Sequence, residues 1–94
     1  MQDPAPPAEK DAEEVRPWDK DRDPPIRTKA YTGAGRPRMR VRTGGQWRDA
    51  RVRARHDWPD GVRLLCDVYL PDGDGSWAWY VRYFRWDPTA MRTR

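Results

Sequence analysis

The chain of 94 residues has little of the chemistry on which small metal-binding and catalytic proteins depend. A single cysteine, Cys66, excludes an internal disulfide, and with the single histidine, His56, it cannot supply a usual structural zinc site. We therefore expect no metal and no cofactor. No apolar run reaches the length of a membrane span, and the acidic, proline-rich start is unlike a signal peptide. These absences predict a cytoplasmic protein that does not contact a membrane.

Asparagine is also absent, isoleucine occurs once, and all three lysines lie before residue 30. This composition, rich in Ala, Gly, Pro, Arg and Asp, is typical of proteins encoded by high-GC bacterial genomes. Residues 31–94 carry thirteen arginines against seven aspartates, a balance that favours an anionic partner such as nucleic acid or an acidic protein. Two explanations for the arginines remain open: genomic codon bias, or selection for bidentate phosphate contacts.

Apolar side chains are concentrated in the second part of the chain. Residues 1–35 hold most of the prolines and few large apolar residues, too few to offset the entropy lost when a backbone is ordered. We predict that 1–35 is a disordered, charged arm and that 36–94 is a small folded domain. Trp18 stands among charged residues of the arm, and an isolated tryptophan of this kind is a candidate anchor for a partner.

The folded part shows the period-two alternation of β-strands rather than the period of helices. Strands are predicted over about 38–42, 46–55, 62–70 and 76–85, with a last short strand over 91–93. Gly44 and Gly45 suit a tight hairpin turn, because paired glycines accept positive φ. Asp87 followed by Pro88 predicts a single 3-10 turn before the last strand. Trp47 has the wrong parity for its strand unless a β-bulge intervenes.

This order of elements, together with two short motifs, resembles the SH3-like small barrels of the Tudor-like branch. The stretch Trp47-Arg48-Asp49-Ala50-Arg51-Val52 is similar to the W-x-x-A-x-V segment that opens the second strand of these domains. The closing Asp87-Pro88-Thr89-Ala90-Met91-Arg92 is similar to their terminal turn and strand. The resemblance implies a five-stranded barrel over 36–94 that binds peptides, methylated side chains or nucleic acids. The usual F-x-D-Y-G segment is replaced by Tyr83-Phe84-Arg85-Trp86, which argues against recognition of methyl groups.

Two sets of residues are candidates for ligand contact. Arginines that alternate along the first hairpin should form a ladder on one face, where an anion would relieve their mutual repulsion. These are Arg36, Arg38, Arg40, Arg42, Arg51, Arg53 and Arg55. The aromatic residues exceed what one small core can hide, so some should be exposed for stacking or for partner contact. The candidates are Trp47, Trp58, Trp77, Trp79, Tyr80 and Trp86.

The alternatives to a binding role find little support in the sequence. Cys66 is predicted on the apolar face of a strand, where a cysteine is usually inert, and His56 is predicted in a turn. We therefore expect no enzyme. Gly35-Arg36-Pro37 matches part of a minor-groove hook, although a proline leading into an edge strand is the simpler interpretation. Two functions remain: a nucleic-acid-binding or nucleoprotein-associated module, or a protein-interaction adaptor that docks through the aromatic fourth strand and Trp18.

Overall fold

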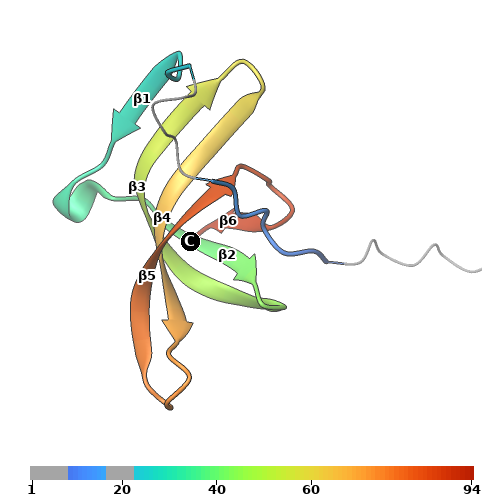
Figure 1. Ribbon diagram of the computed structural model, residues 1–94. Coiled ribbons are helices and arrows are strands. Elements are labelled where there is room, and N and C mark those ends of the chain that lie inside the picture. The colour runs from blue at the N-terminus through green and yellow to red at the C-terminus, as the bar shows by residue number, and fades with distance from the viewer. Residues whose placement is uncertain (1–8, 17–22) are drawn as a thin grey trace, which may run out of the picture.

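The computed structural model describes residues 9–16 and 23–94, and these form an antiparallel β-sheet fold (Figure 1). The prediction of an all-β protein is confirmed. The elements are β1 (Arg27–Ala30), the 3-10 helix η1 (Gly33–Gly35), β2 (Arg38–Thr43), β3 (Gln46–Trp58), β4 (Gly61–Pro71), β5 (Trp77–Arg85) and β6 (Met91–Thr93).

Neighbouring strands pair in the order β5-β4-β3-β2-β6, and β1 pairs with β3 beyond the end of β2. Tight turns connect β2 to β3 and β3 to β4, as the glycines predict. Gly44 and Gly45 have φ of 61° and 76°, in the left-handed region that a side chain would disfavour. β4 and β5 form a long hairpin that projects beyond the other strands (Figure 1).

The core lies on the inner face of this curved sheet, at the alternate positions that the period-two pattern predicts. Val41, Cys66 and Val68 are fully buried, and Phe84 of β5 is the largest side chain among the fully buried residues. Ala90 and Met91 close the core from the last turn and β6. A cluster of this size is modest, so the many main-chain hydrogen bonds between strands must carry much of the specificity of the fold.

The strand count and the helical turn differ from the predictions. Residues 9–16 and 23–94 contain six strands rather than five, in an open sheet. The additional strand, β1, lies within the stretch 1–35 that was expected to be disordered. All four of its residues are exposed, so no apolar pattern marks it, and it is held by pairing with residues 54–57 of β3. The only 3-10 helix among the described residues is η1.

The turn before β6 is a single hydrogen-bonded turn instead of the predicted 3-10 helix. The amide of Ala90 donates to the carbonyl oxygen of Asp87 at 3.1 Å, and the Asp87 carboxylate accepts from both the amide and the hydroxyl of Thr89. The Asp87 side chain therefore satisfies the turn locally, and the chain enters β6 directly afterwards.

Residues 9–16 lie across the opening between β5 and the end of β2. Glu13 accepts a hydrogen bond from the amide of Arg85, and the amide of Val15 donates to Tyr83, so the segment extends the free edge of β5. The amide of Ala12 donates to the carbonyl of Arg42 at the other side of the opening. This part of the predicted arm is thus an integral layer of the fold rather than a separate tail.

Candidate nucleic-acid interface

The strand register brings side chains from four strands together on the outer face of the sheet. Residues directly opposite each other in an antiparallel pair share a face. Arg38 lies opposite Arg51, Arg51 opposite Asp67, and Asp67 opposite Val81, which forms one row across β2, β3, β4 and β5. Two residues further along, Arg40 faces Asp49 and Tyr69 faces Trp79. We call the set Arg38, Arg40, Arg51, Tyr69, Trp77 and Trp79 the outer patch.

Three aromatic rings form one end of the outer patch. Tyr69 stacks on Trp77 with ring centroids 5.4 Å apart and meets Trp79 at 5.0 Å. The two tryptophans are 49% and 45% exposed, respectively, which is unusual for the largest apolar side chains. Contact with Tyr69 holds the two indoles in position, and part of each indole ring remains accessible to solvent.

Guanidinium groups border these rings. The Arg51 guanidinium lies 5.1 Å from the centroid of Trp79, within the range of a cation–π interaction. Within the described part of the chain, neither Arg38 nor Arg51 has a carboxylate in ion-pair range, whereas Arg40 has Asp49 at 3.9 Å. Shallow hollows surround Trp79, and the charged residues that line one of them are Arg38, Arg51, Arg94 and Asp49. The patch therefore combines accessible rings with two arginines, Arg38 and Arg51, that form no ion pair in the described chain, and with Asp49 and Asp67 close to them.

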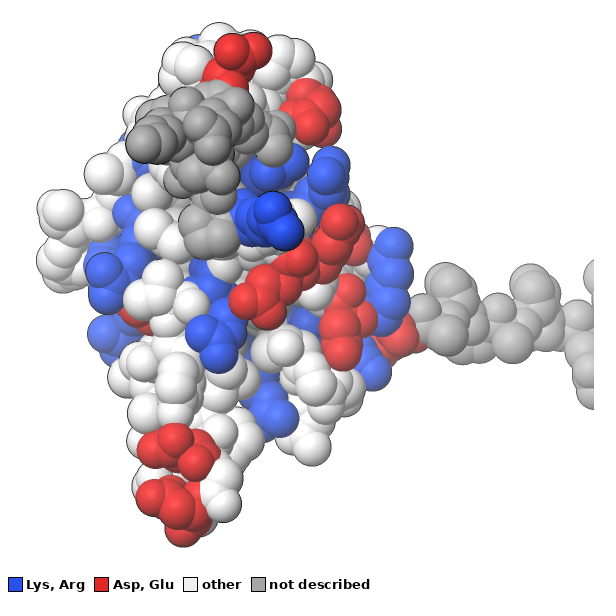
Figure 2. All heavy atoms as spheres, viewed as in Figure 1, with Lys and Arg blue, Asp and Glu red and all other residues white. Residues whose placement is uncertain are grey.

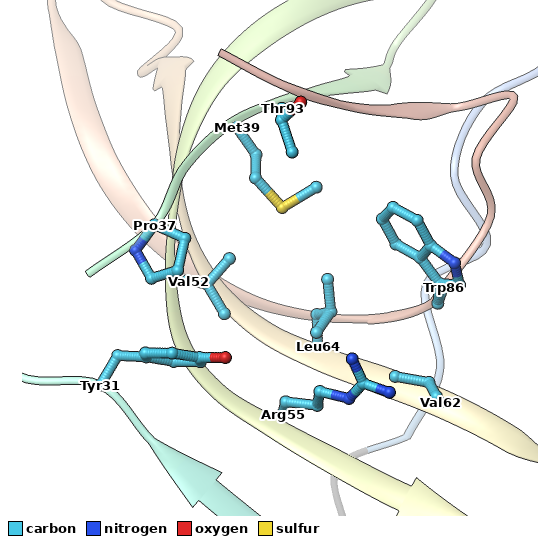
Figure 3. Close-up of a pocket in the computed structure, with 9 residues that line it drawn as sticks. All are labelled: Tyr31, Pro37, Met39, Val52, Arg55, Val62, Leu64, Trp86 and Thr93. Carbon is cyan, nitrogen blue, oxygen red and sulfur yellow. The ribbon is translucent and has the colours of Figure 1, made fainter. Parts of the chain in front are cut away.

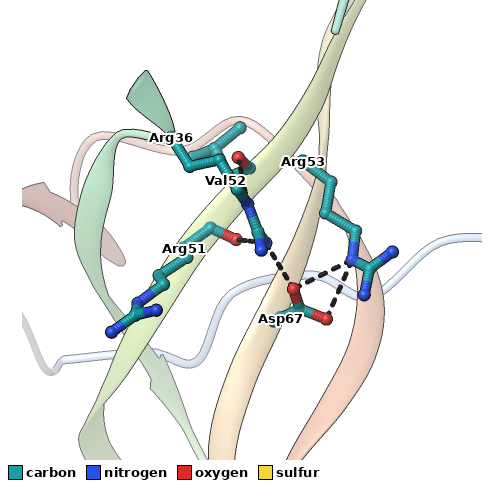
Figure 4. A network of polar contacts seen from close by, with 5 residues as sticks. All are labelled: Arg36, Arg51, Val52, Arg53 and Asp67. Carbon is teal, nitrogen blue, oxygen red and sulfur yellow. Dashed lines mark hydrogen bonds and ion pairs between the residues drawn. The ribbon is translucent and has the colours of Figure 1, made fainter. Parts of the chain in front are cut away.

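Two other predicted arginines are held by a carboxylate instead of facing solvent (Figure 4). Asp67 is only 7% exposed and receives Arg53 Nε on both carboxylate oxygens at 2.9 Å, together with Arg36 Nη2. Arg36 also donates to the main-chain carbonyls of Arg51 and Val52. Burial alone would raise the pKa of Asp67, but the hydrogen bonds and charges of Arg53 and Arg36 outweigh it and lower that pKa.

This arrangement changes the interpretation of the Gly35-Arg36-Pro37 motif. The Arg36 side chain folds onto the sheet, and the carbonyl of Pro37 accepts a hydrogen bond from the amide of Val52 at 2.9 Å. The segment therefore leads into β2 as an edge connection. In this conformation Arg36 is committed to Asp67 and is not free to enter a DNA groove.

A β-bulge separates Arg55 from the rest of the predicted ladder. The register of β3 against β4 shifts between Val52 and Ala54, so Arg53 is the extra residue and the parity of the strand reverses after it. Arg55 consequently lies opposite Leu64, on the inner side, and pairs with Asp57 at 2.8 Å. The expectation that all the arginines of the hairpin share one face is wrong at this position.

The remaining ladder arginine, Arg42, lies under the N-terminal segment. Its side chain is only 15% exposed and has Glu9 at 3.6 Å and Asp11 at 3.7 Å. In Figure 2, acidic side chains cross the basic surface where this segment runs and also gather at the tip of the β4–β5 hairpin. The positive charge of the domain is thus divided by carboxylates into separate areas.

The other predicted aromatic contacts are dispersed over the molecule. Trp58 is 6% exposed, and its indole donates to the carbonyl of Asp23 at 2.9 Å, so it belongs to the interior rather than to an exposed site. Trp47 is half-buried beneath the Arg92 guanidinium, which is 4.0 Å from its ring. Tyr80 donates its hydroxyl to Asp72, and Trp86 is exposed beside a cavity on the inner side. Trp18 lies outside the described residues.

Asp67 is not among the site residues predicted from the sequence, and Tyr69 is predicted only as one of the surplus aromatic residues. A signal was present, because the alternation along 62–70 places both on the same face, opposite the core residues. What alternation alone could not supply is the register with β3, which places Asp67 opposite Arg51, and the side-chain contacts through which Asp67 binds Arg53 and Arg36.

Comparison of the chain with protein-family models, curated proteins and solved structures found no match. The geometry of the site is therefore the basis for any functional assignment. None of the described segments forms a helix long and apolar enough to cross a membrane. In residues 9–16 and 23–94, no group of three or more His, Cys, Asp or Glu side chains is arranged to hold a metal ion.

Proposed function

We propose that the protein is a non-enzymatic binding module whose outer patch holds single-stranded nucleic acid. The observation that carries this proposal is the juxtaposition of two half-exposed indoles with two arginines that have no acidic partner in the described chain. Stacking of bases on aromatic rings and pairing of phosphates with arginines are the two interactions on which single-strand binding rests.

The aromatic residues favour a single strand over a duplex. Trp77 and Trp79 alternate along β5 and therefore stand about 6.6 Å apart on the same face. In a duplex the bases are already stacked on each other, so flat rings on a sheet would find no base surface to cover. In a single strand the bases can turn outward and lie on the indoles.

The arginines set the expected strength and salt dependence. Arg38, Arg40 and Arg51 could neutralise about three phosphates. For a single strand this predicts a slope of about −2 when the logarithm of the association constant is plotted against the logarithm of the salt concentration. Asp49 and Asp67 lie among these arginines and reduce the local potential. We therefore expect moderate affinity that is strongest at low ionic strength.

The test is fluorescence anisotropy with a labelled twelve-nucleotide single-stranded DNA and its RNA equivalent, measured at several salt concentrations. Trp79→Ala should weaken binding roughly 5- to 160-fold, since one stacked base contributes about 1–3 kcal/mol. Arg51→Gln should make the salt slope shallower by about 0.7. Trp86→Ala is the matched control, because Trp86 is similarly exposed but lies on the other side of the sheet.

Two results would overturn the proposal. One is an absence of binding at low salt, and the other is an affinity that Trp79→Ala and Trp86→Ala lower equally. If the oligonucleotides do not bind while an acidic protein is retained through Trp79, the second candidate, a protein-interaction adaptor, takes the place of the first. Its other proposed anchor, Trp18, would then be the next residue to substitute.

The non-enzymatic part of the proposal is supported by the state of the two most reactive side chains. Burial raises the pKa of the Cys66 thiol to about 12, so the thiolate needed for nucleophilic attack is scarce. His56 lies within 2.6 Å of the Tyr83 hydroxyl, and its pKa is lowered by burial. Neither group lies in the outer patch.

A further inference from the structure

A second candidate site lies on the inner side of the sheet, away from the outer patch. A cavity of about 350 Å³ opens there, and Figure 3 shows the side chains that line it. Met39, Val52, Val62 and Leu64 supply apolar walls, and the exposed ring of Trp86 forms part of the rim. A space of this size is at the lower end of the range for ligand pockets and is large enough for one bulky apolar group.

A smaller, cationic hollow adjoins this apolar cavity. The hollow has a volume of about 240 Å³ and shares Tyr31 and Arg55 with the cavity, while Arg27, Lys29 and Asp57 complete it. Three cations therefore face one carboxylate. Since Arg55 is paired with Asp57 at 2.8 Å, the charges of Arg27 and Lys29 are the ones that an added anion would meet.

The geometry of β1 suits an extended ligand. Arg27 and Lys29 lie two positions apart in β1, so their side chains are spaced about 6.6 Å apart on one face, and Tyr31 follows directly after the strand. Among the described residues, β1 pairs with β3 alone, which leaves its second edge available for main-chain hydrogen bonds. A peptide added along a free edge in this way presents alternate side chains to the surface of the domain.

We infer that this composite groove binds an extended acidic peptide segment of a partner protein. One large apolar side chain of the peptide fills the cavity beside Trp86. Carboxylates at alternate positions beyond it face Lys29 and Arg27. Charge complementarity decides between occupants, because a basic segment would meet three cations and an entirely apolar one would leave Lys29 and Arg27 without a counter-ion. This binding is independent of the proposed function of the outer patch.

The experiment uses the full chain and a fluorescein-labelled probe peptide of sequence Gly-Leu-Gly-Glu-Gly-Glu-Gly, with fluorescence anisotropy as the readout. We expect saturable binding that weakens at least tenfold when the probe leucine is replaced by serine. Binding should also weaken at least tenfold in the double variant Arg27→Glu/Lys29→Glu. The variant Arg38→Glu/Arg51→Glu carries the same change of charge on the outer patch, and it should leave peptide binding within about twofold of the unmodified chain.

A second variant protects the test from a folding defect in β1. Thr93, an exposed residue of β6, borders the cavity, so Thr93→Phe should occupy part of its volume and weaken the leucine peptide without touching the cationic hollow. Near-ultraviolet circular dichroism checks that each variant keeps its tertiary structure.

Several outcomes would overturn the inference. One is no saturable binding of the probe, and another is equal affinity for the leucine and serine peptides. A third is displacement of the probe by equimolar decanoate, which would assign the groove to small amphiphilic anions. Displacement by the single-stranded oligonucleotide would make the groove part of the nucleic-acid surface. If instead the oligonucleotide fails to bind while the peptide binds, only the proposed function of the outer patch is refuted.

Discussion

Replacing Asp67 with asparagine separates the structural arginines from those that can bind a ligand. The substitution keeps the shape of the side chain but removes the charge that holds Arg36 and Arg53. Breaking a fully buried ion pair costs about 3–5 kcal/mol, because the remaining charge is left without a partner. Here the Arg36 side chain is 22% exposed and that of Arg53 is 51% exposed, so water compensates part of the loss. We therefore expect Asp67→Asn to lower the free energy of unfolding by about 2 kcal/mol.

The assay is equilibrium unfolding in urea, followed by tryptophan fluorescence. A domain of this size has a free energy of unfolding of roughly 5–10 kcal/mol, so the variant should still fold and give a complete transition. Asp49→Asn is the matched control, since it removes the same charge from the same face where the carboxylate is 43% exposed and bridges Arg40 and Arg94. Exposed pairs contribute about 1 kcal/mol or less, so the control should change stability little.

The same substitution should strengthen nucleic-acid binding, although it lowers the stability of the fold. Removing a negative charge beside Arg51 raises the potential of the outer patch. For one exposed charge pair in water this amounts to about 0.5 kcal/mol, or roughly twofold tighter binding of a single-stranded oligonucleotide at low salt. The reasoning is refuted if Asp67→Asn costs no more stability than Asp49→Asn. A variant of unchanged stability and much tighter binding would mean that Arg36 and Arg53 belong to the interface instead.

Two further predictions concern the N-terminal segment and the single histidine. Ala12→Asp should displace residues 9–16, because Ala12 is only 9% exposed and its amide donates to the carbonyl of Arg42. The Arg85 amide donates to the carbonyl of Glu13 in that segment, so its hydrogen exchange should accelerate. Unchanged exchange at Arg85 would contradict this. Burial lowers the pKa of His56 below its usual value of about 6.5, so near neutral pH the unfolded chain binds more protons than the folded one. The neutral ring therefore contributes its full stability above about pH 6.5, and this contribution is lost as the pH falls through the lowered pKa. The urea midpoint of unfolding should therefore decrease as the pH is lowered from 7.5 to 5, and this decrease should be smaller in His56→Gln. An equal decrease in the variant would mean that other titratable groups cause the pH dependence.

The alternation of apolar and polar residues was sufficient to predict four of the strands and their hairpin order. It works here because each of these strands buries one face, so the requirement for a core determines the parity of Val41, Val52 and Val68. β1 escaped prediction for the same reason: its residues are all exposed, and pairing of main-chain groups leaves no trace in side-chain type.

Local turn chemistry was predicted in part. The glycines at 44 and 45 adopt the positive φ that the hairpin requires. At Asp87, however, the same aspartate that can cap a helix can also close a turn through its side chain, and the short distance to β6 favours the turn. Residues 9–16 follow neither rule. Their acidic side chains pair with Arg82 and Arg85, which is a long-range match that no local pattern contains.

The arginines show why the candidate site could be predicted only in outline. Composition supplies many arginines whatever their use, so their number does not distinguish codon bias from function. The placement of the few carboxylates shows which of the arginines are already paired: Asp67 holds Arg36 and Arg53, Asp57 holds Arg55, and the N-terminal segment covers Arg42. Each of these assignments depends on register or on the bulge at Arg53, which are tertiary properties. Of the predicted ladder, Arg38 and Arg51 remain without an ion pair in the described chain, and both line a hollow beside the exposed indole of Trp79. The distribution of negative charge, more than the abundance of positive charge, therefore determines which arginines of the ladder are left without an ion pair.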